Sequence, residues 1–433
     1  MLARPQLDRL KTAQNTSLDV ARLPTNTTTR SHSVHRWFNF IAGFSPELVD
    51  ACMATVGEPH SSLRLLDPFS GCGTAPLAAR LAGATSIAYE AHPFFAQISE
   101  AKANSPLYVG ELKSIAAIIS EAIVEAKSDL VSLSSSASTF LLKMFNLSDL
   151  IALVSARDAL MARGFGGNPL AFLILSRMLD HCCFAATDGI YKAPTSPKAA
   201  SSPTEALRRV MSLVSADIIQ AEKNPASVEI IVKSSEVMSE VESASIDLVV
   251  TSPPYLNNFD FAEMTRMYLY FWNIAASWGE ITEKVRGRLI VNTTTALKGH
   301  KHRQEYYRST LPGGLIGEVS SVVASLEKQR SEKAGKKEYD YIVYPYLSQM
   351  QSVLKECHRA LKPGASFHMM VSDAALYGVH IPAPQWLAEI MRQIGFRDID
   401  CELVRLRGHR WVLEKREGSA NGLGEYYVHG KAT

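Results

Sequence analysis

The chain lacks the features that would place it in a membrane or around a zinc ion. Its 433 residues contain no apolar run of about 18 residues, the length that a membrane-spanning helix needs. Residues 1–16 lack the apolar core of a secretory signal peptide. None of the six cysteines forms a C-x-x-C pair, so we expect no metal site and free thiols in a reducing compartment. We therefore expect a cytoplasmic protein.

The chain also lacks a strong excess of charge of either sign. Its formal net charge is +2 at pH 7, so any nucleic-acid surface must be a local patch. A hydrophobic content of 46% and a charged content of 20% are typical of a globular protein with a sizeable core. The length predicts two to three lobes.

The order of apolar runs predicts an α/β fold. A strand at 63–66, a glycine-bearing loop at 67–74, a helix at 76–82 and a strand at 86–90 form a βαβ unit. Ser45 is expected to cap a helix that begins at Pro46. A helical region is expected at 110–225, interrupted by a loop at 187–203, whereas 280–340 shows no clear periodicity. Further strands are expected at 229–232, 246–250 and 366–372, followed by a final strand pair, and further helices at 346–361 and 385–394. We expect a mostly parallel, Rossmann-like sheet with a final antiparallel pair and an inserted helical lobe.

The glycine-bearing loop reads Asp67-Pro68-Phe69-Ser70-Gly71-Cys72-Gly73-Thr74. Glycines let backbone amides approach a ligand closely, and Glu90 at the end of the next strand can accept hydrogen bonds from ribose hydroxyls. A third glycine, which would admit a pyrophosphate, is missing, because Ala75-Pro76-Leu77 follow. The loop therefore suits a nucleoside ligand without a diphosphate, such as S-adenosylmethionine. The alternative is a tight turn with a satisfied acid.

A second motif follows the apolar strand at 246–250. The segment Thr251-Ser252-Pro253-Pro254-Tyr255 is a stiff loop, because proline fixes its own backbone and extends the preceding residue. It holds a hydroxyl, a carbonyl and an aromatic face together. The alternative is a strand that ends at a proline and packs a tyrosine.

These two motifs together resemble those of the amino-methylating DNA methyltransferases, which modify the exocyclic amine of cytosine or adenine. The segments HRWFNFIAGFSPELVDACM and YLSQMQSVLKECHRALKPGASFHMMVSD resemble the family as well. The resemblance covers roughly 35–100 and 229–430. It implies S-adenosylmethionine as cofactor, bound by Phe44, Asp67, Phe69, Ser70, Gly71, Gly73, Thr74, Glu90, Ser235 and Thr251.

The resemblance also implies a base that is taken out of the DNA stack. Ser252 Oγ and the Pro253 carbonyl would accept hydrogen bonds from its amine, with Pro254 stiffening the loop, and Tyr255 would stack on the ring. Within the family, serine at the first position of this motif favours cytosine N(4) over adenine N(6). An RNA methyltransferase, a protein glutamine methyltransferase and a catalytically inactive nucleic-acid-binding protein are the alternatives. Double-stranded DNA is the expected partner, together with a cognate restriction endonuclease in a modification or defence role.

Two positions depart from the family pattern. The aspartate that usually holds the adenine ring is absent from Lys233-Ser234-Ser235-Glu236, where Ser235 or Glu236 would substitute. His92 stands where a small polar residue is commoner, and we assign it no catalytic role.

Two regions compete for contact with DNA, namely the helical region at 110–225 and a basic stretch with interleaved tyrosines, Tyr306 and Tyr307. Such a mixture suits phosphates and stacking, although a solvated loop face is the alternative. The candidates in the basic stretch are Lys284, Arg286, Arg288, Lys298, Lys301, Arg303 and Arg308. Weaker candidates are Lys192, Lys198, Arg405, Arg407, Arg410 and Trp411.

The expected division of the chain follows from these assignments. It comprises an arm at 1–34, the cofactor-binding first half at 35–109, a helical insertion at 110–225, the catalytic strand and loop at 226–279, a basic insertion at 280–340 and a C-terminal half at 341–433.

Overall fold

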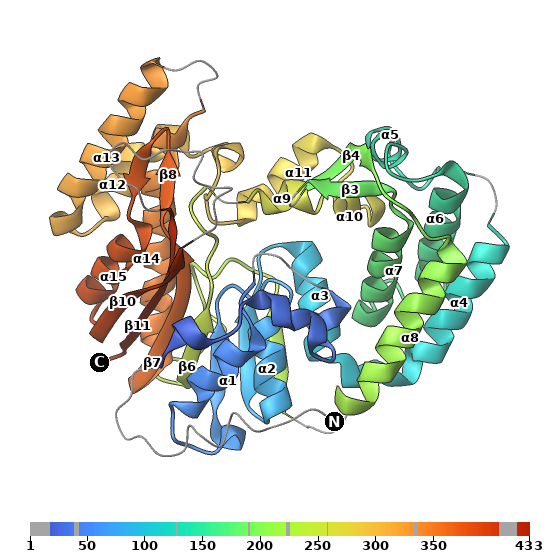
Figure 1. Ribbon diagram of the computed structural model, residues 1–433, viewed down its shortest axis with the longest axis horizontal. Helices are drawn as coiled ribbons and strands as arrows, with labels where there is room; N and C mark the ends of the chain where they lie inside the picture. Colours follow the sequence, from blue (N-terminus) through green and yellow to red (C-terminus); the bar gives the residue numbers. More distant parts are fainter. Residues whose placement is uncertain are drawn as a thin grey trace.

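A computed structural model describes residues 18–38, 43–126, 129–188, 191–221, 226–257, 259–332, 337–406 and 422–433. Its centre is a seven-stranded sheet in the order β10-β11-β7-β6-β1-β2-β5 (Figure 1). Five neighbouring strands from β7 to β5 are parallel, and β11 is antiparallel to both of its neighbours. The expected fold class is therefore confirmed. The strands are β1 (Arg64–Asp67), β2 (Thr85–Tyr89), β5 (Val228–Ile231), β6 (Ile246–Thr251), β7 (Leu361–Ser372), β10 (Arg397–Leu406) and β11 (Gly424–Lys431).

Helices cover both faces of the sheet. Alternate residues of a strand point to opposite faces, so Leu65 and Leu248 enter one core while Leu66 and Val249 enter the other. The first core is closed by α1 (Pro46–Ala54) and α2 (Thr74–Ala82), and the second by α14 (Val343–Ala360) and α15 (Ala383–Ile394). Because both faces are covered, the central strands are nearly continuous apolar runs, as the sequence shows.

A helical lobe is inserted between α3 (Pro93–Ala103) and β5 (Figure 1). Its core also contains residues from three short helices that follow Tyr255, among them Ala262, Phe271 and Ile281. The chain therefore passes from the second motif directly into the helical lobe. The helices of this lobe are α4 (Leu112–Val124), α5 (Ser135–Leu141), α6 (Leu147–Ala162), α7 (Pro169–Cys182), α8 (Pro203–Ala221), α9 (Phe261–Met264), α10 (Arg266–Phe271) and α11 (Trp278–Lys284).

Two expectations about secondary structure were wrong. The loop expected at 187–203 contains β4 (Tyr191–Pro197), which pairs with β3 (Ala185–Asp188). This pair is a two-stranded sheet, where prolines are tolerated because they need not donate to a second neighbour.

The region at 280–340 is also more regular than expected. It contains α12 (Gln304–Thr310) and α13 (Gly313–Glu332). On α13 only Leu315, Val319 and Leu326 are buried, which leaves too sparse an apolar stripe for a clear helical period. A small hairpin of β8 (Ala374–Leu376) and β9 (Val379–Ile381) completes the structure. No helix in the described part of the chain has the length and apolar character needed to cross a membrane.

Candidate active site at the carboxyl edge of the sheet

The glycine-bearing loop lies close against α3. Gly71 and Gly73 have φ angles of 53° and 83°, a backbone region that favours glycine. A Cβ at Gly73 would lie 2.7 Å from Ser99 Oγ and 3.0 Å from Ser99 Cα. Ser70 Oγ and Ser99 Oγ are 2.8 Å apart, and Thr74 is buried as the first residue of α2. The sequence therefore needs glycine at position 73 because the loop and helix approach so closely.

Glu90 joins this loop to the next strand. Its Oε2 accepts from the Gly71 amide at 2.7 Å, and its Oε1 accepts from the His92 amide at 2.7 Å. Burial raises the pKa of Glu90 to about 8, although these two backbone hydrogen bonds oppose the shift. The carboxyl group therefore stands at the end of β2 in an environment that disfavours its charge.

Asp67 brings the two sequence motifs together. Its Oδ1 accepts from Thr251 Oγ1 at 2.7 Å and from the Phe69 amide at 3.0 Å. Its Oδ2 is buried without a hydrogen-bond partner among the described residues. Burial raises the pKa of Asp67 to about 7. The ends of β1 and β6, 184 positions apart in the sequence, thus meet at one carboxylate.

The residues after β6 keep their polar groups accessible. Ser252 and Pro254 are half-buried, and Pro253 is buried. The Ser252 hydroxyl makes no hydrogen bond to the residues that the structure describes. Tyr255 donates from its hydroxyl to Glu425 Oε1 at 2.8 Å. A free hydroxyl beside a stiffened carbonyl is what an incoming donor group would need.

Two further cofactor candidates lie at this edge or beside it. Ser235 is buried in the loop after β5, and its Oγ has no partner within the described ranges. Phe44 is half-buried beside the start of α1, and it lines a pocket together with Tyr255. Ser45 occupies the N-cap position of α1 as expected, but its side chain makes no capping hydrogen bond.

His92 connects the sheet to the helical lobe. Its Nδ1 accepts from the Phe94 amide at 3.2 Å, so Nε2 carries the proton and donates to Thr265 Oγ1 at 2.9 Å. Burial lowers the pKa of His92 to about 3, which keeps the ring neutral. This geometry gives His92 a structural role.

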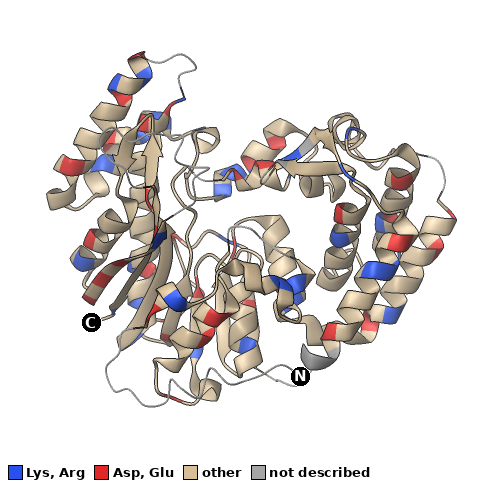
Figure 2. Ribbon diagram, in the orientation of Figure 1, with Lys and Arg blue, Asp and Glu red and all other residues tan. Residues whose placement is uncertain are grey.

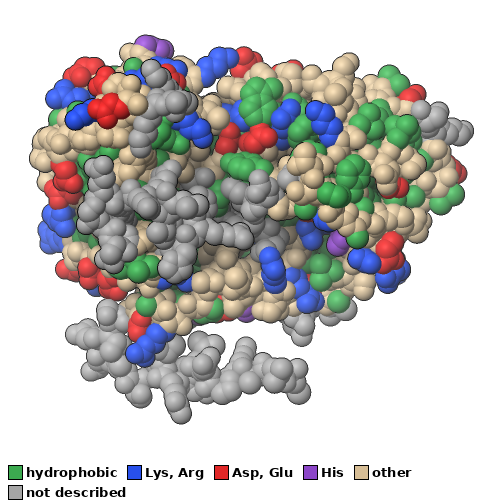
Figure 3. Space-filling model, turned by 45° about the horizontal axis from the view of Figure 1, so that its top comes forward, with side chains coloured by type: hydrophobic (Ala, Val, Ile, Leu, Met, Phe, Trp, Pro, Cys, Tyr) green, Lys and Arg blue, Asp and Glu red, His purple; other side chains and the backbone are tan. Residues whose placement is uncertain are grey.

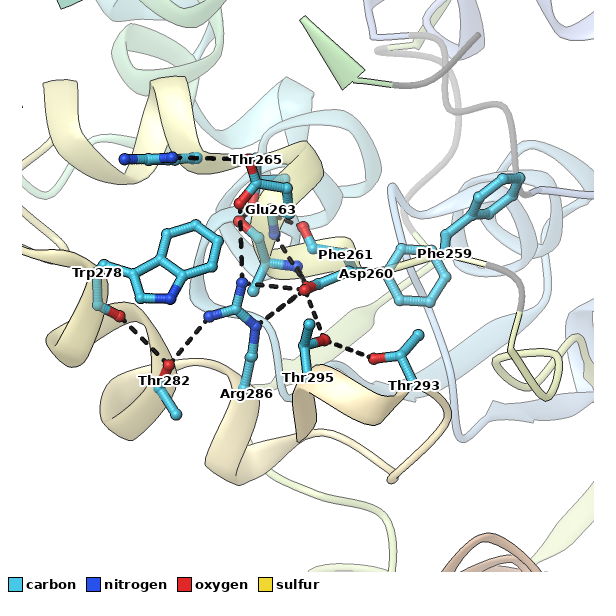
Figure 4. Close-up of polar contacts among 12 residues, drawn as sticks. Phe259, Asp260, Phe261, Glu263, Thr265, Trp278, Thr282, Arg286, Thr293 and Thr295 are labelled. Carbon is cyan, nitrogen blue, oxygen red and sulfur yellow. Dashed lines mark hydrogen bonds and ion pairs between the residues drawn. The ribbon is translucent and has the colours of Figure 1, made fainter. Parts of the chain in front are cut away.

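A polar cluster around Asp260 fixes the segment after the second motif (Figure 4). Asp260 Oδ1 accepts from the amides of Ala262 and Glu263 at 3.1 and 3.0 Å, so it caps α9. Its Oδ2 lies 3.0 Å from Arg286 Nη2 and accepts from Thr295 Oγ1 at 2.8 Å. Arg286 itself is buried, with its guanidinium 4.3 Å from the centre of the Trp278 ring.

Asn292 holds the same segment by its backbone. This buried side chain donates to the Phe259 carbonyl at 3.0 Å and to the Tyr255 carbonyl at 3.4 Å. Sequence reasoning missed both Asn292 and Asp260. An aspartate directly before an aromatic, helix-forming run is a recognisable N-cap signal, whereas nothing local to Asn292 marks it.

The basic stretch is largely neutralised by its own surroundings. Of its seven candidates, only Arg288 and Arg303 have no acidic partner among the described residues. Arg303 lies over the rings of Tyr306 and Tyr307, at 4.7 and 5.2 Å from their centres. The paired candidates are Lys284 with Glu280, Arg286 with Asp260, Lys298 with Glu283, Lys301 with Glu338 and Arg308 with Glu305.

Charges of both signs are mixed along this region. Lys and Arg lie among Asp and Glu along α12 and α13 (Figure 2). Charges of both signs also lie beside one another on the face of the molecule in Figure 3. The weaker candidates behave similarly. Lys192 pairs with the Asp180 carboxylate, and Arg405 Nε lies 2.5 Å from Glu425 Oε2. Lys198 instead donates to the backbone carbonyl of Asp180. Arg407, Arg410 and Trp411 lie outside the described residues.

Comparisons with known proteins bear on this site. No protein-family model matches the chain. The chain is 24% identical over 477 residues to the type II methyltransferase M.BsoBI of Geobacillus stearothermophilus, covering 98% of this chain and 90% of that protein. This nearly full-length similarity supports a methyltransferase, and therefore an enzyme.

A solved structure gives a weaker likeness. It is the rRNA methyltransferase aviRa of Streptomyces viridochromogenes, with a TM-score of 0.31, 10% identity and coverage of 96% of each chain. At this TM-score the likeness carries no argument about fold or substrate.

Proposed function

We propose that the chain is an S-adenosylmethionine-dependent DNA methyltransferase that modifies the exocyclic amine of an extruded base, with cytosine N(4) favoured. The observation that carries the proposal is the hydrogen bond of 2.7 Å from Thr251 to Asp67. It brings the segment Ser252–Tyr255 to the glycine-bearing loop, so the two motifs form one site. The similarity to a type II methyltransferase supports the same conclusion.

Unpartnered groups at this edge support the cofactor. Asp67 Oδ2 and Ser235 Oγ are buried without partners in the described structure. Buried polar atoms of this kind normally have a partner, so a ligand that brings donors fits the site. S-adenosylmethionine carries an ammonium group, ribose hydroxyls and an exocyclic amine, and Glu90, at the end of β2, is the proposed ribose acceptor. When bound, the cofactor supplies a methyl group on a positively charged sulfur.

The chemistry of the target amine assigns roles to the second motif. The lone pair of an exocyclic amine is delocalised into its ring, which makes the amine a poor nucleophile. Ser252 Oγ and the Pro253 carbonyl oxygen accept hydrogen bonds from the two N–H groups of this amine, and they draw its nitrogen toward a tetrahedral arrangement. Because Pro253 and Pro254 fix the loop, these acceptors need no rearrangement during the reaction. Tyr255 stacks on the ring, a contact worth about 1–3 kcal/mol.

The proposed DNA-binding residues differ in whether they must give up an acidic partner before they can bind a phosphate. Arg288 and Arg303 are exposed and lack acidic partners in the described part of the chain, so they are free to meet phosphates. The paired lysines and arginines would have to exchange an acid for a phosphate. Buried Arg286 is held by Asp260, which favours a structural role. The helical lobe is the second proposed contact, because α9 begins within a few residues of Tyr255.

The proposal is tested by the nucleosides of DNA from cells that express the protein, compared with cells that express Ser252→Ala. A methylated cytosine that disappears in the variant supports both the reaction and the base. Methylated adenine would keep the reaction and correct the base. If no DNA nucleoside is modified, the DNA assignment is wrong, and the RNA fraction is examined next. A cognate restriction endonuclease stays a proposed partner.

A further inference from the structure

A pocket of about 290 Å³ adjoins the second motif. Its walls include Phe44, Ser45, Tyr255, Met370, Arg405 and Glu425. Phe44, Tyr255 and Met370 contribute apolar surface to it, and Arg405 and Glu425 contribute one ion pair. This volume is at the lower end of ligand pockets.

A chain of three side chains fixes one wall of this pocket. The Tyr255 hydroxyl donates to Glu425 Oε1 at 2.8 Å, and Glu425 Oε2 accepts from Arg405 Nε at 2.5 Å. Arg405 and Glu425 are direct neighbours on β10 and β11, so the sheet sets their separation. A tyrosine on a loop is thereby tied to two paired strands of the sheet.

We propose that Glu425 is a positioning residue, which holds the Tyr255 ring at the angle needed for stacking on the base. The inference rests on the proposed function. The pocket lies on the side of Tyr255 that faces Phe44 and Glu425, and neither Ser252 nor Pro253 lines it, so the carboxylate acts on the tyrosine rather than on the base. Arg405 acts through Glu425, because it holds that carboxylate in place.

The test uses Tyr255→Phe, which removes only the hydroxyl, and Glu425→Gln, which leaves one acceptor oxygen for two donors. The matched control is Tyr108→Phe, since the Tyr108 hydroxyl donates to Glu100 at 2.7 Å away from the motif. The modified sequence is first mapped with the wild-type protein. A duplex oligonucleotide carrying 2-aminopurine in place of the target base then reports extrusion of that base by its fluorescence.

We expect each of the two pocket variants to lower kcat/KM for DNA about tenfold, the effect of one hydrogen bond to a charged group. The double variant should be no worse than the worse single variant, because both changes break one interaction. In both variants the fluorescence of 2-aminopurine should fall, while the dissociation constant for S-adenosylmethionine should stay within about twofold of the wild-type value. The control Tyr108→Phe should match the wild type in all three measurements.

Two results would overturn the inference. Wild-type kinetics and fluorescence in both pocket variants would remove the positioning role. A weaker affinity for S-adenosylmethionine with unchanged base extrusion would show that Glu425 and Tyr255 serve the cofactor instead. Failure of the wild-type protein to methylate any DNA is a separate outcome, which would overturn the proposed function and this positioning role with it.

Discussion

Two groups of buried or half-buried carboxylates flank the second motif, and they differ in whether every oxygen has a hydrogen-bond partner. At the carboxyl edge of the sheet, burial raises the pKa values of Asp67 and Glu90 to about 7 and about 8. One oxygen of Asp67 has no partner in the described chain. In the segment after the motif, both oxygens of Asp260 accept hydrogen bonds from the chain, and Arg286 balances its charge.

We expect this difference to separate a role in ligand binding at the edge of the sheet from a structural role in the segment after the motif. A buried acceptor without a partner costs free energy that a bound donor can recover. A buried carboxylate with complete partners offers little to a ligand, and losing it leaves other groups unsatisfied. Changes at the first group should therefore act on binding as well as on stability, and changes at the second on stability.

The largest expected effect on stability is that of Asp260→Ala. The change removes the N-cap of α9 and leaves buried Arg286 with the more distant carboxylate of Glu263, at 3.8 Å, so the free energy of unfolding should fall by about 3 kcal/mol. The affinity of the folded protein for S-adenosylmethionine should not change. Denaturation in urea and calorimetry measure the two quantities. Glu205→Ala is the control, because Glu205 pairs with Arg208 and Arg209 on the surface, and little change in stability is expected. An Asp260→Ala protein as stable as the wild type would contradict the structural role of Asp260.

For Glu90→Ala we expect an effect on both binding and stability. Loss of this acceptor should weaken the binding of S-adenosylmethionine about tenfold. The amides of Gly71 and His92 also lose their acceptor, so the free energy of unfolding should fall by about 1–3 kcal/mol, less than in Asp260→Ala. Calorimetric titration measures the affinity. Glu229→Ala is the matched control, since Glu229 is exposed on the neighbouring strand β5 and should bind as the wild type does. Unchanged affinity in Glu90→Ala would contradict the ribose assignment.

Replacing Gly73 tests how strongly the contact with α3 constrains the glycine-bearing loop. Gly73→Ala combines a φ of +83° with a Cβ only 2.7 Å from Ser99 Oγ. Gly57→Ala has a similar φ of +76° with no atom within 4 Å, so it isolates the conformational penalty. Gly73→Ala should therefore be more destabilising than Gly57→Ala by about 1–3 kcal/mol, the cost of overpacking. Equal losses in thermal denaturation would mean that the contact with α3 does not constrain the loop.

A dependence of stability on pH is also expected. Between the ordinary pKa values of 3.8 and 4.5 and the raised values of about 7 and 8, folded Asp67 and Glu90 hold protons that the unfolded chain has released. Stability from these groups is thus complete below pH 4 and is lost as pH rises through the raised values. The Asp67→Asn, Glu90→Gln double variant should show a flatter decline in urea midpoints between pH 5 and 8. If the urea midpoint of the double variant falls with pH as steeply as that of the wild type, the raised pKa values of Asp67 and Glu90 are contradicted.

The sequence predicted the positions of Asp67, Glu90 and Thr251 better than those of Asp260 and Asn292, for a physical reason. The first three residues stand at strand ends, and parallel strands bring such ends to one edge. The contacts of Asp260 and Asn292 depend on how the chain returns from the helical lobe, which no local pattern encodes.

Some charge partners were missed for the same reason. Lys301 pairs with Glu338 and Arg286 with Asp260, which lie far away in the sequence, whereas Lys284 and Arg308 pair with acids on the same helical turn. The strands β3 and β4 and the helices α12 and α13 escaped prediction because prolines and sparse apolar residues hid their periods.

The most direct test of the central claim is mass spectrometry of nucleosides from DNA of cells that express the wild-type protein or Ser252→Ala. We predict N(4)-methylcytosine in the first sample and a loss of at least about a hundredfold in the second, the usual effect of removing one positioned transition-state contact. Equal methylation in both samples would contradict the assignment of Ser252, and unmodified DNA in both would contradict the proposed function.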